Sequence, residues 1–269
     1  MANYMLIAGC SHAAGSEIDG TMSSPENREA SFGNLLAKML DHKPINIARN
    51  GSSNSAIHRS ILNWFTLNKE IVENKNNNLF VLINWAESNR MEGPLLRPGN
   101  DVENLSHFTG EGGGNQDSSA DWEDPTHADY VQVNVMTDPH SIKGPEKEAF
   151  VTTQRFLVYS PIYTEILTAK DALSMQYFLQ TQDNGTNIRY LMTNSGIAFS
   201  DYNMRHLKPY LEKLDATRYY KYRDNRFGFY EKYKLEGMLN PNAKYGHHGA
   251  DAHTARATDL ANYIKQKNI

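Results

Sequence analysis

Three short polar segments in the first third of the chain carry residue types that could do nucleophilic chemistry. They are residues 9–12 (Gly-Cys-Ser-His), residues 50–54 (Asn-Gly-Ser-Ser-Asn) and residues 84–87 (Asn-Trp-Ala-Glu). A serine hydroxyl is a poor nucleophile until a base removes its proton and N–H donors face the developing oxyanion. Ser11 can supply the hydroxyl, and the backbone N–H groups of Ser11 and Gly51 can supply the donors. Acyl transfer through a serine, with Ser11 as a candidate nucleophile, is therefore a chemistry that these residue types could support.

Each segment follows an apolar run that predicts a buried strand. Residues 4–8, 44–48 and 79–83 form these runs, and residues 32–40 and 57–65 carry apolar side chains at helical spacing. Strands that alternate with helices predict an α/β fold, here a doubly wound parallel sheet of about five strands with helices on both faces. Ligands of such sheets bind outside the carboxyl ends of the strands, so the three polar segments should lie together.

The periodic pattern breaks between residues 93 and 145, where Gly, Asn, Asp and Pro are frequent. Loops of this length in compact domains are usually functional, so we expect an insertion that forms a lid or rim over the strand ends. The chain, residues 1–269, is otherwise read as one domain. After the insertion, we expect helices over residues 152–181, 205–214 and 250–266. One further strand is expected at residues 188–192.

Composition excludes several classes of protein. The formal net charge is −4, so no global positive field exists to attract nucleic acid. A single cysteine, Cys10, supports neither an internal disulfide nor a cysteine-rich metal site, and we expect no metal and no cofactor. No apolar run reaches the roughly 18 residues of a membrane span. Residues 6–10 look like a lipoprotein cleavage site, but no Lys or Arg precedes them, so we expect a cytoplasmic protein.

The first two polar segments resemble sequence blocks of the SGNH (GDSL-like) serine hydrolases. Residues 9–15 resemble the family's Gly-Asp-Ser block with its downstream glycine, which implies that Ser11 is the nucleophile. Residues 46–54 resemble the second block, whose glycine donates a backbone N–H to the oxyanion, here Gly51. The resemblance implies a flavodoxin-like SGNH hydrolase fold. It covers the sheet core and the tail, and not residues 93–240.

The third segment departs from the family pattern. The family has Gly-x-Asn-Asp, with the asparagine side chain as an oxyanion donor, and this chain has Ala86 in that place. Asn84 or Ser88 can stand in from neighbouring positions, and loss of one donor costs about 100- to 1,000-fold in rate. Substrate-contact candidates also lie near the strand exits, where ligands bind. These candidates are Asn54, Trp85 and Arg90.

The catalytic base must come from the tail, where two alignments compete. With His247 as the base, His253 and Ala257 fall where the family has its second histidine and alanine, and Lys244 takes the place of the family's aspartate. With His253 as the base, Asp251 lies beside it as the acid. We favour His247. In that alignment either Asp251 orients His247 from the adjoining turn, or the enzyme works with a Ser-His dyad.

Two functions from different classes are compatible with these residues. The first is an esterase that removes a small acyl group, such as O-acetyl from a carbohydrate, through an acyl-enzyme on Ser11. The second is a non-catalytic binding or structural module that keeps the fold, which Ala86 and Lys244 favour. The Ser-His opening and the shortened tail block resemble proteins encoded by large tailed bacteriophages, which implies the virion or the infected host cell as alternative locations. We expect neither nucleic acid nor a membrane as a partner.

Overall fold

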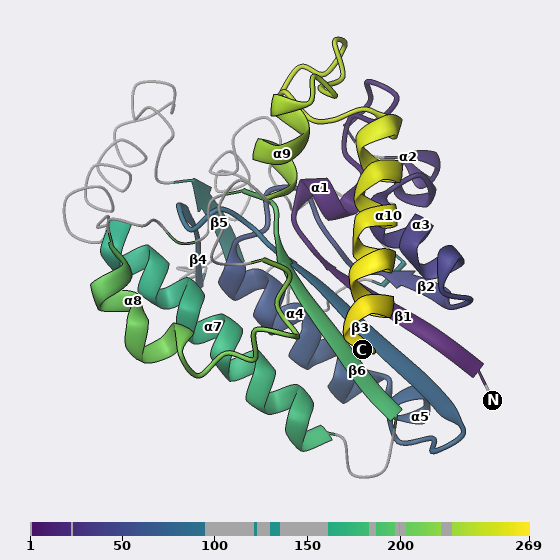
Figure 1. Cartoon of the computed structure of the whole chain (residues 1–269), viewed down its shortest axis with the longest axis vertical. Coiled ribbons are helices and arrows are strands. Elements are labelled where there is room, and N and C mark those ends of the chain that lie inside the picture. Colours follow the sequence, from purple (N-terminus) through teal and green to yellow (C-terminus); the bar gives the residue numbers. More distant parts are fainter. Residues whose placement is uncertain are drawn as a thin grey trace, which may run out of the picture.

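The computed structural model describes residues 2–22, 24–94, 121–122, 130–134, 161–182, 187–196, 199, 203–221 and 228–269. Its centre is a four-stranded, all-parallel sheet in the order β2-β1-β3-β6 (Figure 1). The strands are β1 (Ala2–Gly9), β2 (Lys43–Asn46), β3 (Asn77–Trp85) and β6 (Asn187–Asn194). The predicted α/β class with a parallel sheet is confirmed.

Helices cover both faces of this sheet (Figure 1). One face packs against α4 (Asn54–Leu67), α5 (Lys69–Val72), α7 (Pro161–Gln182) and α8 (Met204–Leu211). The other face packs against α1 (Ser11–Ala14), α3 (Phe32–Met39), α9 (Phe229–Leu235) and α10 (Ala250–Lys267), with α2 (Pro25–Glu29) beside α1 and α3.

The central strands alternate their side chains between these two layers. In β1, Leu6 and Ala8 face the α4 and α7 side, whereas Met5 and Ile7 face the α3 and α10 side, and all four are buried. Burial on both faces explains why the strands read as continuous apolar runs rather than as an alternating pattern. Each such side chain contributes roughly 1.5–3 kcal/mol of burial free energy, apart from the smaller alanine.

The number of strands differs from the prediction of about five. Within the described residues, the parallel sheet has four strands, and beyond β6 a single parallel bridge joins Met192 to Tyr219. The Met192 N–H donates to the Arg218 carbonyl at 2.8 Å, and the Tyr220 N–H donates to the Met192 carbonyl at 2.8 Å. Turns and bends precede and follow this bridge, so the pairing stops after one residue.

The predicted insertion over residues 93–145 contains part of a second, two-stranded sheet. In it, β4 (Arg90–Pro94) pairs antiparallel with β5 (Tyr130–Asn134). The rest of the insertion, apart from residues 121–122, lies outside the described residues, and the lid stays a prediction. Residues 152–160, predicted as helical, also lie outside them. The helix that follows begins at Pro161, a residue type that the first helical turn tolerates.

The helix that carries Ser11 is anchored through a close backbone approach at its end. Gly15 terminates α1 in the left-handed region with φ of +78°, and a Cβ atom there would collide with the Asn27 carbonyl oxygen of α2. Only glycine satisfies both conditions without strain. The family-like glycine downstream of Ser11 therefore has a packing role in this chain.

We expect Gly15→Ala to lower the free energy of unfolding by about 3 kcal/mol, of which about 1 kcal/mol is backbone strain and the rest is the clash. Gly237→Ala is the matched control, because Gly237 has φ of +75° and nothing within 4 Å of the added Cβ. It should cost only the backbone strain. Denaturant unfolding measures both variants, and equal losses would contradict the close packing of α1 on α2.

Candidate active site

The strand order places three strand exits side by side at one edge of the sheet. Because β1 lies between β2 and β3, the exit that leads to Ser11 is flanked by the exits that lead to Gly51 and Ala86. Ser11 begins α1 directly after Cys10 and is 3% exposed. The predicted convergence of the three polar segments is therefore present in the fold, in the place where open α/β sheets bind ligands.

Two backbone donors lie at these exits without a hydrogen-bond partner in the part of the chain that the structure describes. Among the described residues, neither the Ser11 N–H nor the Gly51 N–H makes a hydrogen bond. Gly51 has φ of +73°, a conformation that glycine adopts readily, and its turn is held by the Ser16 hydroxyl, which donates to the Asn50 side chain. Unpaired N–H groups in a partly buried position are suited to bind an oxyanion or a carbonyl oxygen.

His247 forms a hydrogen-bonded pair with a carboxylate that the sequence did not suggest. Its Nδ1 lies 2.6 Å from Oε2 of Glu17, which follows α1 in the chain. Glu17 is buried and also accepts the Tyr245 N–H at 3.2 and 3.1 Å. Because a carboxylate can only accept, the Nδ1 of His247 carries the proton, and in the neutral ring Nε2 is left with a lone pair.

The Glu17 backbone is held in an unfavourable conformation. Its φ is +58°, in the left-handed region that costs a non-glycine residue of order 1–2 kcal/mol. The strain is held by contacts with the tail, since the Asn240 side-chain amide donates to the carbonyls of Glu17 and Ile18 at 2.6 and 3.2 Å. These contacts aim the Glu17 carboxylate at His247, and strain of this kind is frequent at functional sites.

Burial keeps His247 neutral. Desolvation lowers the pKa of His247 below its ordinary value, and the hydrogen bond and charge of Glu17 offset part of that fall. A neutral imidazole at pH 7 is able to accept a proton. In the described residues the Ser11 hydroxyl makes no hydrogen bond, to His247 or to any other group. The ring of His12, the residue after Ser11, lies 5.0 Å from the His247 ring.

The competing base, His253, lies in a different environment. It is buried on α10, its Nδ1 accepts the Phe32 N–H at 3.1 Å, and its ring stacks on Phe32 at 5.9 Å. Asp251 is exposed in the first turn of α10. The carboxylate that contacts His247 is therefore Glu17 instead of Asp251, which corrects the expected acid. No local pattern indicated Glu17, because it meets His247 only through the tertiary fold.

At the third exit, the Asn84 side chain is buried and already hydrogen-bonded. Asn84 is fully buried, and its side-chain amide donates to the Ser195 hydroxyl at 2.5 Å. That hydroxyl also lies 2.9 Å from the Cys10 sulfur. The amide predicted as an oxyanion donor is thus engaged inside the sheet. The Asn54 side chain instead makes two hydrogen bonds with the backbone of Ala86. It accepts one from the Ala86 N–H at 2.7 Å and donates one to the Ala86 carbonyl at 3.2 Å.

Of the other two substrate-contact candidates, Trp85 is buried and Arg90 acts on the candidate base through its charge. Trp85 is 0% exposed and packs in the core on the α4 and α7 side, so it presents no surface to a substrate. Arg90 forms an ion pair with Glu87 at 2.9 Å, and its charge contributes to lowering the pKa values of His247 and His12. Arg90 therefore lies close enough to act electrostatically on the candidate base.

No protein-family model and no curated protein matches this sequence. Among the described residues, no group of three or more His, Cys, Asp and Glu side chains is arranged to hold a metal ion. No helix in the part of the chain that the structure describes is long and apolar enough to cross a membrane.

We expect the buried histidines to make folding sensitive to mild acid. Burial lowers the pKa of His248 to about 4 and that of His253 to about 3, against 6.5 when unfolded. Below pH 6.5 the unfolded chain binds more protons, so the free energy of unfolding should fall by about 1.4 kcal/mol per pH unit for each such histidine. Above pH 6.5 these histidines are neutral in both the folded and the unfolded chain, so this loss of stability is absent.

Denaturant unfolding between pH 5 and 7.5 measures this effect, with His253→Gln as the comparison. That variant retains an acceptor for the Phe32 N–H and lacks the titrating ring. Its stability should therefore vary less steeply with pH, by about 1.4 kcal/mol per pH unit below 6.5. An identical slope in both proteins would mean that His253 titrates normally.

Proposed function

We propose that this chain is a serine esterase of the SGNH type that removes a small acyl group through an acyl-enzyme on Ser11. The observation that carries the proposal is the buried Glu17–His247 pair at the strand exit that bears Ser11. A carboxylate that holds one imidazole nitrogen leaves the other free to act as a base. The unpaired N–H groups of Ser11 and Gly51 add the donors that acyl transfer needs.

The sheet order supports an SGNH-like, flavodoxin-like and doubly wound fold. The order β2-β1-β3-β6 is parallel throughout, and the bridge at Tyr219 continues it in the position of a fifth strand. Flavodoxin-like sheets have this strand order, and their ligands bind beside the first and third strands. Fold alone does not assign an activity, so the proposal depends on the residues of the site.

In the proposed acylation step, the Ser11 oxygen attacks the ester carbonyl while Nε2 of His247 takes the hydroxyl proton. The carbonyl oxygen becomes an oxyanion that accepts hydrogen bonds from the Ser11 and Gly51 N–H groups. Glu17 stabilises the imidazolium that forms. His247 then donates its proton to the departing alkoxide, the carbon–oxygen bond breaks, and the acyl group remains on Ser11.

Deacylation repeats the sequence with water. His247 removes a proton from the water molecule, whose oxygen attacks the acyl carbon, and the proton returns to the Ser11 oxygen as the carboxylic acid leaves. Ala86 supplies no side-chain donor and the Asn84 amide is engaged with Ser195, so two backbone donors carry the oxyanion. Each missing donor costs about 100- to 1,000-fold in rate, which implies a slow enzyme.

Cys10 is a poorer nucleophile than its neighbour. It is fully buried, and desolvation raises the pKa of its thiol, so the reactive thiolate is scarce at neutral pH. Its sulfur lies 2.9 Å from the Ser195 hydroxyl. The geometry therefore favours Ser11 as the nucleophile and Cys10 as a packed residue.

The alternative function is a non-catalytic binding module with the same fold. The absence of a hydrogen bond on the Ser11 hydroxyl among the described residues favours it, as does the diverted Asn84 amide. Loose apo geometry is compatible with catalysis as well, because such hydrogen bonds often tighten only when substrate binds. A fluorophosphonate probe separates the two functions, since it labels only an activated serine; mass spectrometry should find the label on Ser11.

We expect Ser11→Ala to abolish hydrolysis of short-chain p-nitrophenyl esters and labelling by the fluorophosphonate. The melting temperature should stay nearly unchanged, because within the described residues the hydroxyl makes no hydrogen bond whose loss would leave a buried group unpaired. Steady-state kinetics and thermal unfolding measure the two effects. Activity that survives Ser11→Ala and disappears in Cys10→Ala would overturn the assignment of the nucleophile.

We expect Glu17→Gln to lower kcat/KM at least about 100-fold and to move the acidic limb of its pH profile to lower pH. In the folded protein the Glu17 carboxylate raises the pKa of His247, so its removal lets that pKa fall further. Asp251→Asn, at the exposed rival acid, should shift neither quantity. A loss of activity with an unmoved limb would show that Glu17 acts through folding instead of through His247.

A further inference from the structure

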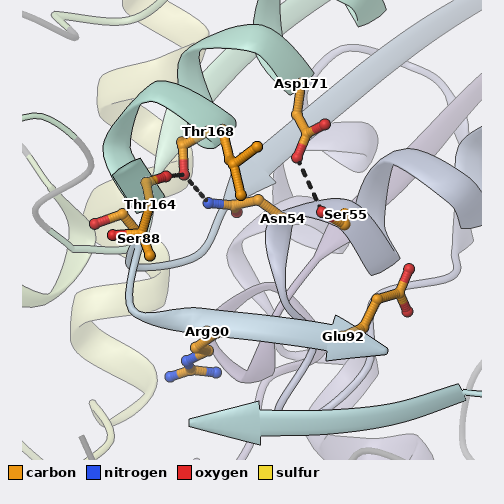
Figure 2. Close-up of a pocket in the computed structure, with 9 residues that line it drawn as sticks. Asn54, Ser55, Ser88, Arg90, Glu92, Thr164, Thr168 and Asp171 are labelled. Atoms are coloured by element: carbon orange, nitrogen blue, oxygen red, sulfur yellow. Dashed lines mark hydrogen bonds between the residues drawn. The ribbon is translucent and has the colours of Figure 1, made fainter. Parts of the chain in front are cut away.

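A polar pocket lies between α7, the start of α4 and the segment that follows β3 (Figure 2). Its cavity volume is about 90 Å³. The lining is rich in hydroxyl, carboxyl and amide groups, and Leu167 is its apolar member. The side chains that define it are Asn54, Ser55, Ser88, Arg90, Thr168 and Asp171.

Internal pairing neutralises most of the charge around this pocket. Glu92, which also lines it, receives two hydrogen bonds from Arg59, at 3.2 and 3.0 Å. Arg90 is paired with Glu87 at 2.9 Å. The remaining carboxyl, Asp171, accepts a hydrogen bond from the Ser55 hydroxyl at 3.2 Å. Among the described lining residues, Asp171 is therefore the carboxyl without an Arg partner, which suits a ligand that donates hydrogen bonds, such as one with hydroxyl groups.

Asp171 is the strongest of these acceptors. Desolvation raises the pKa of its carboxyl to about 6, so at neutral pH the group is largely ionised but poorly hydrated. Hydrogen bonds from ligand hydroxyls would replace the missing hydration, and charge-assisted bonds of this kind are about twice as strong as neutral ones. Figure 2 shows Asp171 on α7 facing Ser55 at the start of α4.

Two residues connect the pocket to the candidate active site. Asn54 lines the pocket and holds the backbone of Ala86, with its amide also donating to the Thr168 hydroxyl at 2.9 Å. Arg90 lines the pocket as well, and its charge acts on His247. The pocket thus opens beside the exits of β2 and β3, which flank the exit that bears Ser11.

The size of the cavity limits the ligand. Since roughly 10–15 Å³ holds one water, the cavity has room for roughly six to nine waters, comparable to one sugar ring. A long acyl chain would need an apolar channel, and Leu167 is the one apolar side chain among the described lining residues. The polarity and the volume both point to a compact polyhydroxylated group.

We propose that this pocket binds a single neutral sugar ring, the alcohol part of the ester that the Ser11 centre cleaves. The inference rests on the proposed esterase function and specifies its substrate class. The sugar hydroxyls would donate to Asp171, exchange hydrogen bonds with Ser88 and donate to the Thr168 oxygen, whose own hydrogen is donated to the Thr164 carbonyl, while the acyl group extends past Asn54 toward Ser11.

Binding without turnover tests the pocket independently of catalysis. Titration of the isotope-labelled full chain with millimolar methyl glucopyranoside should shift the amide NMR signals of Asn54, Ser88 and the α7 turn that ends at Asp171. Asp171→Asn and Ser88→Ala should each weaken the binding, the first by at least about tenfold. Glu212→Gln, an exposed carboxyl on the far end of α8, is the control and should leave it unchanged. If no signals shift, or if the shifted signals belong to other parts of the chain, the proposed sugar site is wrong.

Hydrolysis tests the link between the pocket and Ser11. In Asp171→Asn, kcat/KM should fall at least tenfold more for a mono-O-acetylated methyl glucopyranoside than for p-nitrophenyl acetate. Equal losses on the two substrates would refute the assignment of the alcohol part to this pocket. If the wild-type chain binds the sugar and cleaves neither ester, the esterase function fails while the sugar site stands. If it cleaves p-nitrophenyl acetate and binds no sugar, only the pocket fails.

Discussion

The contact between Glu17 and His247 joins two residues 230 positions apart, and the arrangement of the candidate site depends on it. A buried carboxylate is costly unless hydrogen bonds replace its hydration, and here the His247 ring and the Tyr245 N–H do so. The same contacts hold the loop after α1 against the tail. Ser11 and His247 are thereby carried by two segments that cannot move apart without leaving the Glu17 carboxylate unsatisfied.

The sheet was largely predictable because parallel strands buried on both faces read as apolar runs. The runs at residues 4–8 and 79–83 lie within β1 and β3. The sequence predicted about five strands, whereas the parallel sheet has four within the described residues, because only a one-residue bridge at Tyr219 follows β6 in a segment of turns. The four-residue helix that starts at Ser11 was likewise missed, because fewer than two turns show no helical period.

The site divides into a local part and a tertiary part. Ser11 and Gly51 could be proposed from the sequence because each lies in the polar segment that follows a predicted strand, which is a local feature of neighbouring residues. Glu17 was not, because its role comes from a contact with the tail. Trp85 was predicted to contact substrate, although the alternation of side chains along the strand predicts its burial. It lies two residues after Ile83 and four after Val81, so all three side chains face the α4 and α7 layer. The alternation of side chains along a strand is therefore a better guide to burial than closeness to the strand's end.

The strain at Glu17 bears on the choice between an enzyme and a binding module. A binding module that only keeps the fold does not need a buried carboxylate on a residue whose backbone is in the left-handed region. An exposed loop residue would avoid both the burial and the strain. A general base does need such a carboxylate, because burial alone lowers the pKa of His247 and leaves the imidazolium of the transition state without a counter-charge. Glu17 supplies that charge at 2.6 Å while desolvation keeps the resting ring neutral. In the proposed enzyme, these two opposing effects on His247 would suit proton transfer at neutral pH, and they would account for the strained backbone of Glu17.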